Sequence, residues 1–186
     1  MRKAFTLMAI AALTLVLGCA DPIEDVDSGG VVLEVEFDTS VFRVGVNDAD
    51  LVSLATVTIN SVAVNQTGST SALMDVRLDT IELTYTRIDT GTRVPPPFVY
   101  QLTGSIPVDG TLTFNNMPIM TVEQLQNPPL SDLLFENGAV DRETGAQIIK
   151  MNVTIRVFGD TLGGTRVVSS PATQTFEFVP SLITPT

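Results

Sequence analysis

Strict alternation of apolar and polar residues is the feature that most constrains the fold of this chain. In the segment 31–37, VVLEVEF, every second residue is apolar, and Glu34 and Glu36 fall on the opposite face. The same pattern recurs in the segments 56–60, 81–87, 150–158 and 175–179. Because successive side chains of a strand point to opposite faces, each segment is predicted to be a strand with one buried and one solvated face. Such strands are typical of antiparallel sheets.

The alternation changes phase between two neighbouring segments. Apolar residues fall on even positions in 74–78 and on odd positions in 81–85. A single regular strand would turn one of these sets to solvent, so we expect a bulge or bend at Asp79–Thr80, or a strand that passes between two sheets. The segments together predict an all-β domain over 31–186, namely an immunoglobulin-like antiparallel β-sandwich of about seven to nine strands.

One stretch, 118–138, predicts a short helical connection instead of a strand. Thr121 is followed three residues later by Gln124, which is the spacing of a capping box. An Asn-Pro pair is expected to end this first turn, and an Asn-Gly pair to end a second turn after it. We expect the connection to cover one open end of the sandwich. The side chains expected to pack onto the core are Leu130, Leu133, Leu134 and Phe135.

The amino-terminal residues 1–18 have the three parts of a secretory signal peptide. A basic pair, Arg2–Lys3, precedes an uncharged apolar run over 4–17, and the small Gly18 follows it. The apolar run is shorter than the roughly 20 residues that span a bilayer as a helix. The order of the three parts therefore predicts export of the chain.

Residues 16–19, Val-Leu-Gly-Cys, resemble the lipobox of bacterial lipoproteins, although Leu17 is bulkier than the usual residue. The resemblance implies cleavage before Cys19 and acylation of its thiol, so that the lipid bilayer holds the mature chain. The next residue, Ala20, is not the aspartate that retains such proteins at the inner membrane, so the resemblance favours the outer membrane. The alternative location is the outer face of the cytoplasmic membrane. The alternatives to a lipoprotein signal are an ordinary cleaved signal peptide and an uncleaved anchor helix.

Residues 19–30 follow as an acidic segment, in which charge repulsion and a Gly-Gly pair are typical of a tether. A leader without function is the alternative. Over the whole chain, 10 Lys and Arg stand against 21 Asp and Glu, which is a net charge of −11. This charge repels phosphate groups, so we expect no nucleic-acid partner.

The residue types exclude several catalytic sites. The chain has no histidine, and Cys19 is its single cysteine. Ser-His-Asp and Cys-His nucleophilic sites, and zinc sites built on histidine or thiolate, are therefore excluded. A carboxylate pair for glycoside hydrolysis stays open by residue type, but the chain has no Trp and only 2 Tyr to stack on a sugar. We therefore predict that the protein is not an enzyme.

Acidic loops are the remaining candidates for a ligand site. The segment 45–51, GVNDADL, supplies Asn47, Asp48 and Asp50, whose oxygens are the kind of ligand that calcium prefers. Asn and Asp also favour turns by themselves, so we favour an ordinary turn here, with a calcium site as the alternative. Other acids expected in loops are Asp109, Asp141 and Glu143. We therefore expect no cofactor, and calcium at this loop is the one candidate that stays open.

These observations favour a membrane-anchored, non-catalytic envelope lipoprotein that contacts another protein through a sheet edge or through its end loops. The combination of a lipobox and a domain of strands with alternating apolar and polar residues resembles envelope lipoproteins with an immunoglobulin-like domain. The alternative is a β-sandwich that binds calcium or another small ligand, and a hydrolase built on two carboxylates is a third hypothesis.

Overall fold

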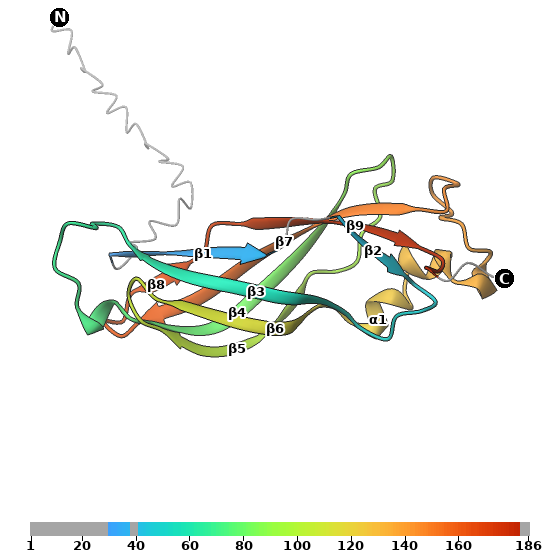
Figure 1. Ribbon diagram of the computed structural model, residues 1–186. Helices are drawn as coiled ribbons and strands as arrows, with labels where there is room; N and C mark the ends of the chain where they lie inside the picture. Colours follow the sequence, from blue (N-terminus) through green and yellow to red (C-terminus); the bar gives the residue numbers. More distant parts are fainter. Residues whose placement is uncertain (1–29, 38–40, 183–186) are drawn as a thin grey trace, which may run out of the picture.

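The computed structural model describes residues 30–37 and 41–182, which form two β-sheets around one core (Figure 1). The first sheet contains, in spatial order, β1 (Val31–Phe37), β3 (Val52–Ala63) and β6 (Thr111–Met120). The second contains β2 (Phe42–Gly45), β9 (Ala172–Val179), β7 (Ile149–Thr161), β4 (Val76–Arg87) and β5 (Phe98–Ile106), and the short β8 (Arg166–Val168) pairs with β7. The predicted all-β sandwich is confirmed, with nine strands in the described residues.

Strand pairing in the described residues is antiparallel except between β2 and β9, which run parallel. The β2–β9 ladder continues past the end of β2, because the Val46 N–H donates to Val179 O over 2.8 Å and the Asn47 N–H donates to Pro180 O over 3.0 Å. This pairing holds the loop after β2 beside the last residues that the structure describes.

The predicted phase change in β4 is a β-bulge. The register of β4 shifts between Leu78 and Thr80 against both of its neighbours, β5 and β7. Leu78 before the shift and Ile81 after it are both buried. The bulge therefore keeps both apolar sets on the core side of one sheet, and β4 does not cross to the other sheet.

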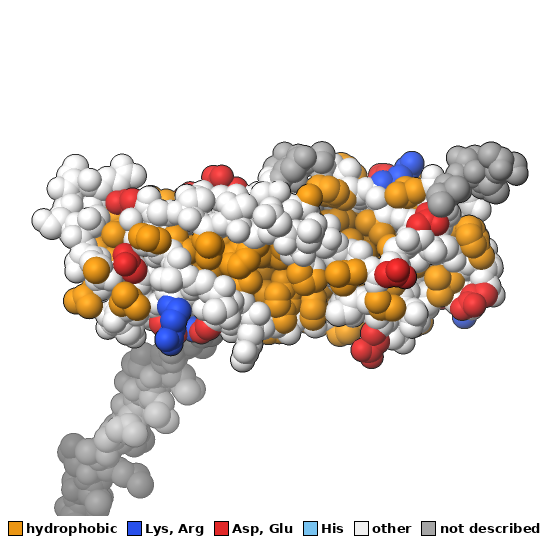
Figure 2. Space-filling model, turned by 60° about the horizontal axis from the view of Figure 1, so that its bottom comes forward, with side chains coloured by type: hydrophobic (Ala, Val, Ile, Leu, Met, Phe, Trp, Pro, Cys, Tyr) orange, Lys and Arg blue, Asp and Glu red, His pale blue; other side chains and the backbone are white. Residues whose placement is uncertain are grey.

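Two tyrosines join the sheets on the side of β5 and β6. Tyr85 of β4 donates from its hydroxyl to Ile119 O over 2.6 Å, and Tyr100 of β5 donates to Pro118 O over 3.0 Å. Burial raises the pKa of each hydroxyl to about 12. Figure 2 views the molecule from this side and shows a band of apolar side chains along the middle of the face.

The predicted helical connection is present as α1 (Val122–Leu125), η2 (Leu130–Leu133) and η3 (Phe135–Asn137). Thr121 and Gln124 form the predicted capping box, and Gly138 ends the last turn with a φ of 99°. Leu130 and Leu133 are buried in the core and Leu134 is half-buried. The prediction for Phe135 is wrong, because its side chain is 62% exposed.

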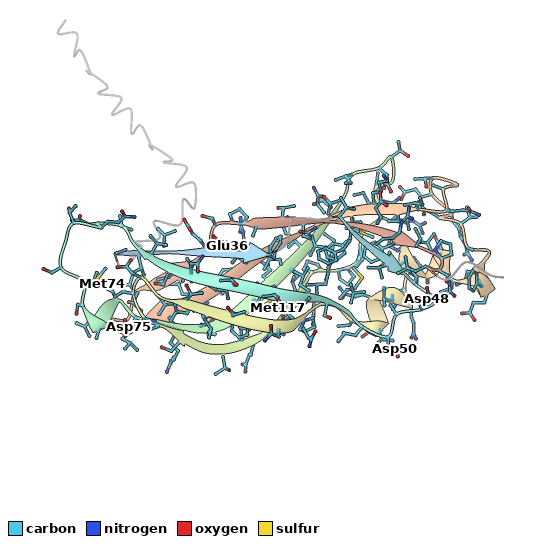
Figure 3. The ribbon with its side chains drawn as sticks, in the orientation of Figure 1. Glu36, Asp48, Asp50, Met74, Asp75 and Met117 are labelled. Carbon is cyan, nitrogen blue, oxygen red and sulfur yellow. The ribbon has the colours of Figure 1, made fainter. Side chains whose placement is uncertain are left out.

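The molecule is elongated, and its two ends differ (Figure 1). The proximal end holds Gly30, the loop 64–75 and the turn 162–164. The distal end holds the loop 46–51 and the connection 121–138. Figure 3 labels Met74 and Asp75 at the proximal end, and Asp48 and Asp50 at the distal end. In the ranges that the structure describes, none of the helices has the length and apolarity of a membrane span.

Candidate functional site

The loop 46–51 joins β2 to β3 at the distal end, and Asn47 fastens it to the connection. The Asn47 amide donates to Pro180 O over 2.7 Å and to Leu133 O over 3.2 Å. Its side-chain oxygen accepts a hydrogen bond from the Phe135 N–H over 3.1 Å. Asn47 therefore acts as a structural clamp between β2, the segment after β9 and the connection.

The other two predicted calcium ligands, Asp48 and Asp50, have different surroundings from each other. Asp48 accepts hydrogen bonds from the Ser181 hydroxyl at 2.9 Å and from the Leu182 N–H at 2.6 Å, so both carboxylate oxygens have protein donors. Asp50 is exposed. In the described residues, no group of three or more Asp, Glu or Cys side chains is arranged to hold a metal ion. Calcium binding at this loop stays a prediction.

The acids of the remaining loops are divided between the two ends. Asp109 lies at the proximal end, where its carboxylate accepts the Ala63 N–H over 2.8 Å. Asp141 and Glu143 lie together in the segment between η3 and β7, beside two arginines. The structure therefore brings Asp141 and Glu143 together, but does not bring Asp109 to the loop 46–51.

A largely buried set of ion pairs, here called the Arg87 cluster, ties the connection to the end of β4. It comprises Arg87, Asp89, Arg93, Asp132, Asp141 and Glu143. The Arg87 side chain is 2% exposed, and its Nε lies 2.6 Å from Asp89 Oδ1 while its Nη2 lies 2.8 Å from Asp141 Oδ2. Arg93 Nη2 lies 2.7 Å from Asp132 Oδ2. The cluster thus joins the segment 87–93 to the segment 132–143, which are far apart in the sequence.

Hydrogen bonds keep the Asp141 and Glu143 carboxylates of this cluster ionised. Burial by itself would raise the pKa of Asp141, but hydrogen bonds from Arg87 and Thr144 outweigh burial and lower the pKa to about 2. Hydrogen bonds from the Thr92 side chain and from the Arg93 and Thr92 N–H groups lower the pKa of Glu143 to about 2. A general acid at neutral pH needs a raised pKa, so these two carboxylates are unsuited to that role.

The Arg87 cluster was missed by the sequence reasoning, although the sequence holds one signal of it. The chain has only 10 Lys and Arg, and Arg87 and Arg93 both fall around one predicted strand end and its loop. Their acidic partners are distant in sequence, since Asp141 lies 54 residues after Arg87. Periodicity reports which face a residue occupies, but it does not report which distant residue lies opposite.

An open cleft of about 820 Å³ lies at the distal end, between the loop 46–51 and the connection. Residues that line it include Ala49, Asp50, Val122, Gln126, Phe135 and Glu136. The Phe135 ring stands exposed beside this cleft, although a ring of this size is normally buried. Its position follows from the backbone, because Asn47 accepts the Phe135 N–H and holds the start of η3 at the surface.

The cleft combines apolar surface with negative charge. Phe135 and Val122 supply exposed apolar side chains, and Asp50 and Glu136 supply carboxylates. Exposed apolar side chains at a concave site mark interaction surfaces, and charge around them selects the partner. The arrangement suits a partner surface that inserts an apolar side chain and flanks it with Lys or Arg.

Comparisons with known proteins do not indicate a function for this site. No protein-family model matches the sequence, and no match is found among curated proteins. Among solved structures, the chain is similar to a protein described as Northeast Structural Genomics Consortium target SoR45, with 10% sequence identity and a TM-score of 0.35. The match covers 86% of this chain and 94% of that chain. A similarity at this level supports no conclusion about function.

Proposed function

We propose that this protein is a lipid-anchored, non-catalytic binding module of the bacterial cell envelope, and that its distal cleft contacts a protein partner. The anchor part of the proposal rests on the lipobox at 16–19, which lies outside the described residues. The outer membrane is the proposed location, because Ala20 follows the cysteine. Replacing Cys19 with Ser should release the protein from the membrane fraction.

The exposed Phe135 beside the cleft is the observation that carries the binding role. Large aromatic side chains that are exposed beside a cleft are typical anchor residues of protein interfaces. The carboxylates of Asp50 and Glu136 favour a partner with basic residues around its contact, since opposite charges speed association and select the partner. We therefore propose a basic protein surface as the occupant of the cleft.

The non-catalytic part of the proposal is supported by the pKa values of the carboxylates. In the described residues, hydrogen bonds and ion pairs lower the pKa of five carboxylates: Asp79, Asp89, Asp141, Glu143 and Glu177. A carboxylate-based hydrolase needs one acid whose pKa is raised.

Site-specific photocross-linking in intact cells tests the partner. A photoreactive amino acid at Phe135 should capture a reproducible protein, whereas the same group at Val99, which is exposed on β5, should not. The substitution Glu136→Lys should weaken the capture, and the matched change Glu34→Lys on β1 should leave it intact. Equal capture at positions 135 and 99 would argue against the cleft as the contact.

The alternative function is a calcium or small-ligand site in the same cleft, which Asp50 and Glu136 favour because both line it. Carboxylate oxygens from two separate loops are ordinary calcium ligands. Calcium should then raise the melting temperature, and a chelator should lower it again. A melting temperature that responds to neither would remove this alternative.

A further inference from the structure

The proximal end carries an apolar tip made of two loops that are hydrogen-bonded to each other. We define the proximal tip as the loop 64–74 and the turn 161–165. The Gly163 N–H donates to Leu73 O and the Leu162 N–H donates to Asp75 O, each over 2.8 Å. Leu73 is 63% exposed and Leu162 is 57% exposed. Two leucines therefore project into solvent from a backbone that hydrogen bonds hold in place.

The proximal tip is also free of charge, in a chain that is strongly acidic elsewhere. Neither the loop 64–74 nor the turn 161–165 contains Asp, Glu, Lys or Arg, although the chain has 21 acidic residues. Charged residues flank the tip: Asp160, just before the turn, pairs with Arg166, just after it, over 3.3 Å, and two other nearby carboxylates accept backbone donors. Asp75 accepts the Val108 N–H over 2.9 Å, and Asp109 accepts the Ala63 N–H over 2.8 Å. The tip thus presents apolar and uncharged polar groups.

The chain enters the sandwich at this same end. Gly30 O accepts the Val64 N–H over 2.9 Å, and Gly30 lies beside the Met74 side chain. Ten residues, 20–29, separate Gly30 from Cys19 in the sequence. A chain of this length spans at most about 40 Å, so an acyl group on Cys19 confines the proximal end to the neighbourhood of the bilayer.

We propose that the proximal tip rests on the lipid bilayer, with the Leu73 and Leu162 side chains in the interface between headgroups and acyl chains. The inference rests on the proposed lipid anchor at Cys19. Apolar side chains gain free energy when they leave water for this interface, and a tip that itself lacks carboxylates lessens the repulsion between this acidic chain and anionic headgroups. Contact at the proximal end turns the cleft at the opposite end away from the membrane, toward a partner.

Fluorescence quenching on vesicles tests the contact. The full, acylated protein is reconstituted into vesicles of phosphatidylethanolamine and phosphatidylglycerol that carry nitroxide groups on their acyl chains. A fluorophore is attached at Ser69→Cys in the tip or at Glu136→Cys at the distal end, both of which are exposed positions. We expect strong quenching at position 69 and none above background at position 136.

A double substitution, Leu73→Ser with Leu162→Ser, should lower the quenching at position 69 roughly tenfold, because the tip loses its apolar contacts with lipid. The matched change Val99→Ser removes an exposed apolar side chain from β5 and should leave the quenching unchanged. Near-ultraviolet circular dichroism shows whether the variants keep the native packing.

The outcomes separate this inference from the anchor on which it depends. Protein that floats with the vesicles but shows equal quenching at both positions overturns the inference and leaves the anchor intact. Quenching at position 69 that is insensitive to the double substitution overturns it as well. Protein that fails to float overturns both. A protein, rather than lipid, captured by a photoreactive group at position 69 in cells would also contradict the inference.

Discussion

Neutralising Asp141 is the sharpest test of the Arg87 cluster. The substitution Asp141→Asn keeps the size of the side chain but removes its charge and replaces one acceptor oxygen with a donor. The carboxylate it replaces is 0% exposed and accepts hydrogen bonds from Arg87 at 2.8 Å and from the Thr144 hydroxyl at 2.6 Å. We expect the substitution to destabilise the protein strongly at neutral pH.

The magnitude follows from the pKa of Asp141, which lies at about 2 against an ordinary value of 3.8. One pKa unit corresponds to about 1.4 kcal/mol, so the carboxylate contributes roughly 2 kcal/mol to the free energy of unfolding at pH 7. Arg87 keeps Asp89 as a partner. The total loss should therefore lie below the 3–5 kcal/mol typical of breaking a buried ion pair outright, at about 2–3 kcal/mol.

The stabilisation by Asp141 should decrease as the pH falls. Because the pKa is lower in the folded state, the stabilisation by Asp141 is fully present above the ordinary value of 3.8 and is lost as the pH falls through about 2. The difference in unfolding free energy between the wild-type protein and Asp141→Asn should shrink over this window. Other carboxylates titrate in both proteins, so the difference isolates position 141.

Equilibrium urea unfolding at pH 7 and at several lower pH values measures the difference. The control substitution, Glu34→Gln, changes an exposed carboxylate on β1 and should alter the free energy of unfolding by less than about 0.5 kcal/mol. A loss for Asp141→Asn as small as that of the control would refute the reasoning. So would a loss that is the same at pH 7 and near pH 2.

Two further substitutions and one pH titration test other parts of the structure. Asn47→Ala removes the clamp on the connection and should cost about 1–3 kcal/mol in urea unfolding, with faster proteolysis within 122–138. Tyr85→Phe leaves Ile119 O without its donor and should cost about 1–2 kcal/mol, whereas the exposed Thr86→Ser should cost little. Absorbance titration should show Tyr85 and Tyr100 ionising near pH 12 in the folded protein. Because this pKa is raised by folding, the free energy of unfolding should fall as the pH rises from 10 toward 12. Ionisation of both side chains near pH 10 in the folded protein would contradict this.

The features that the sequence determined by itself are local. Alternation placed Leu33, Val153 and Phe178 in the core, because a two-residue period on a pleated strand leaves one face for burial. The bulge in β4 followed from the break in that period. The capping box of Thr121 and Gln124 followed from a spacing of three residues. Each depends on neighbours in the chain, so each was open to prediction.

The features that only the tertiary structure decided depend on residues far apart in the chain. The parallel pairing of β2 with β9, the clamp from Asn47 to Leu133 and the bond from Arg87 to Asp141 each join distant segments. Phe135 is as apolar as Leu130 and Leu133, which are buried, yet the clamp leaves it at the surface. Whether a side chain is buried or exposed depends on what lies across from it, and that is settled only when the sheets and their connections pack.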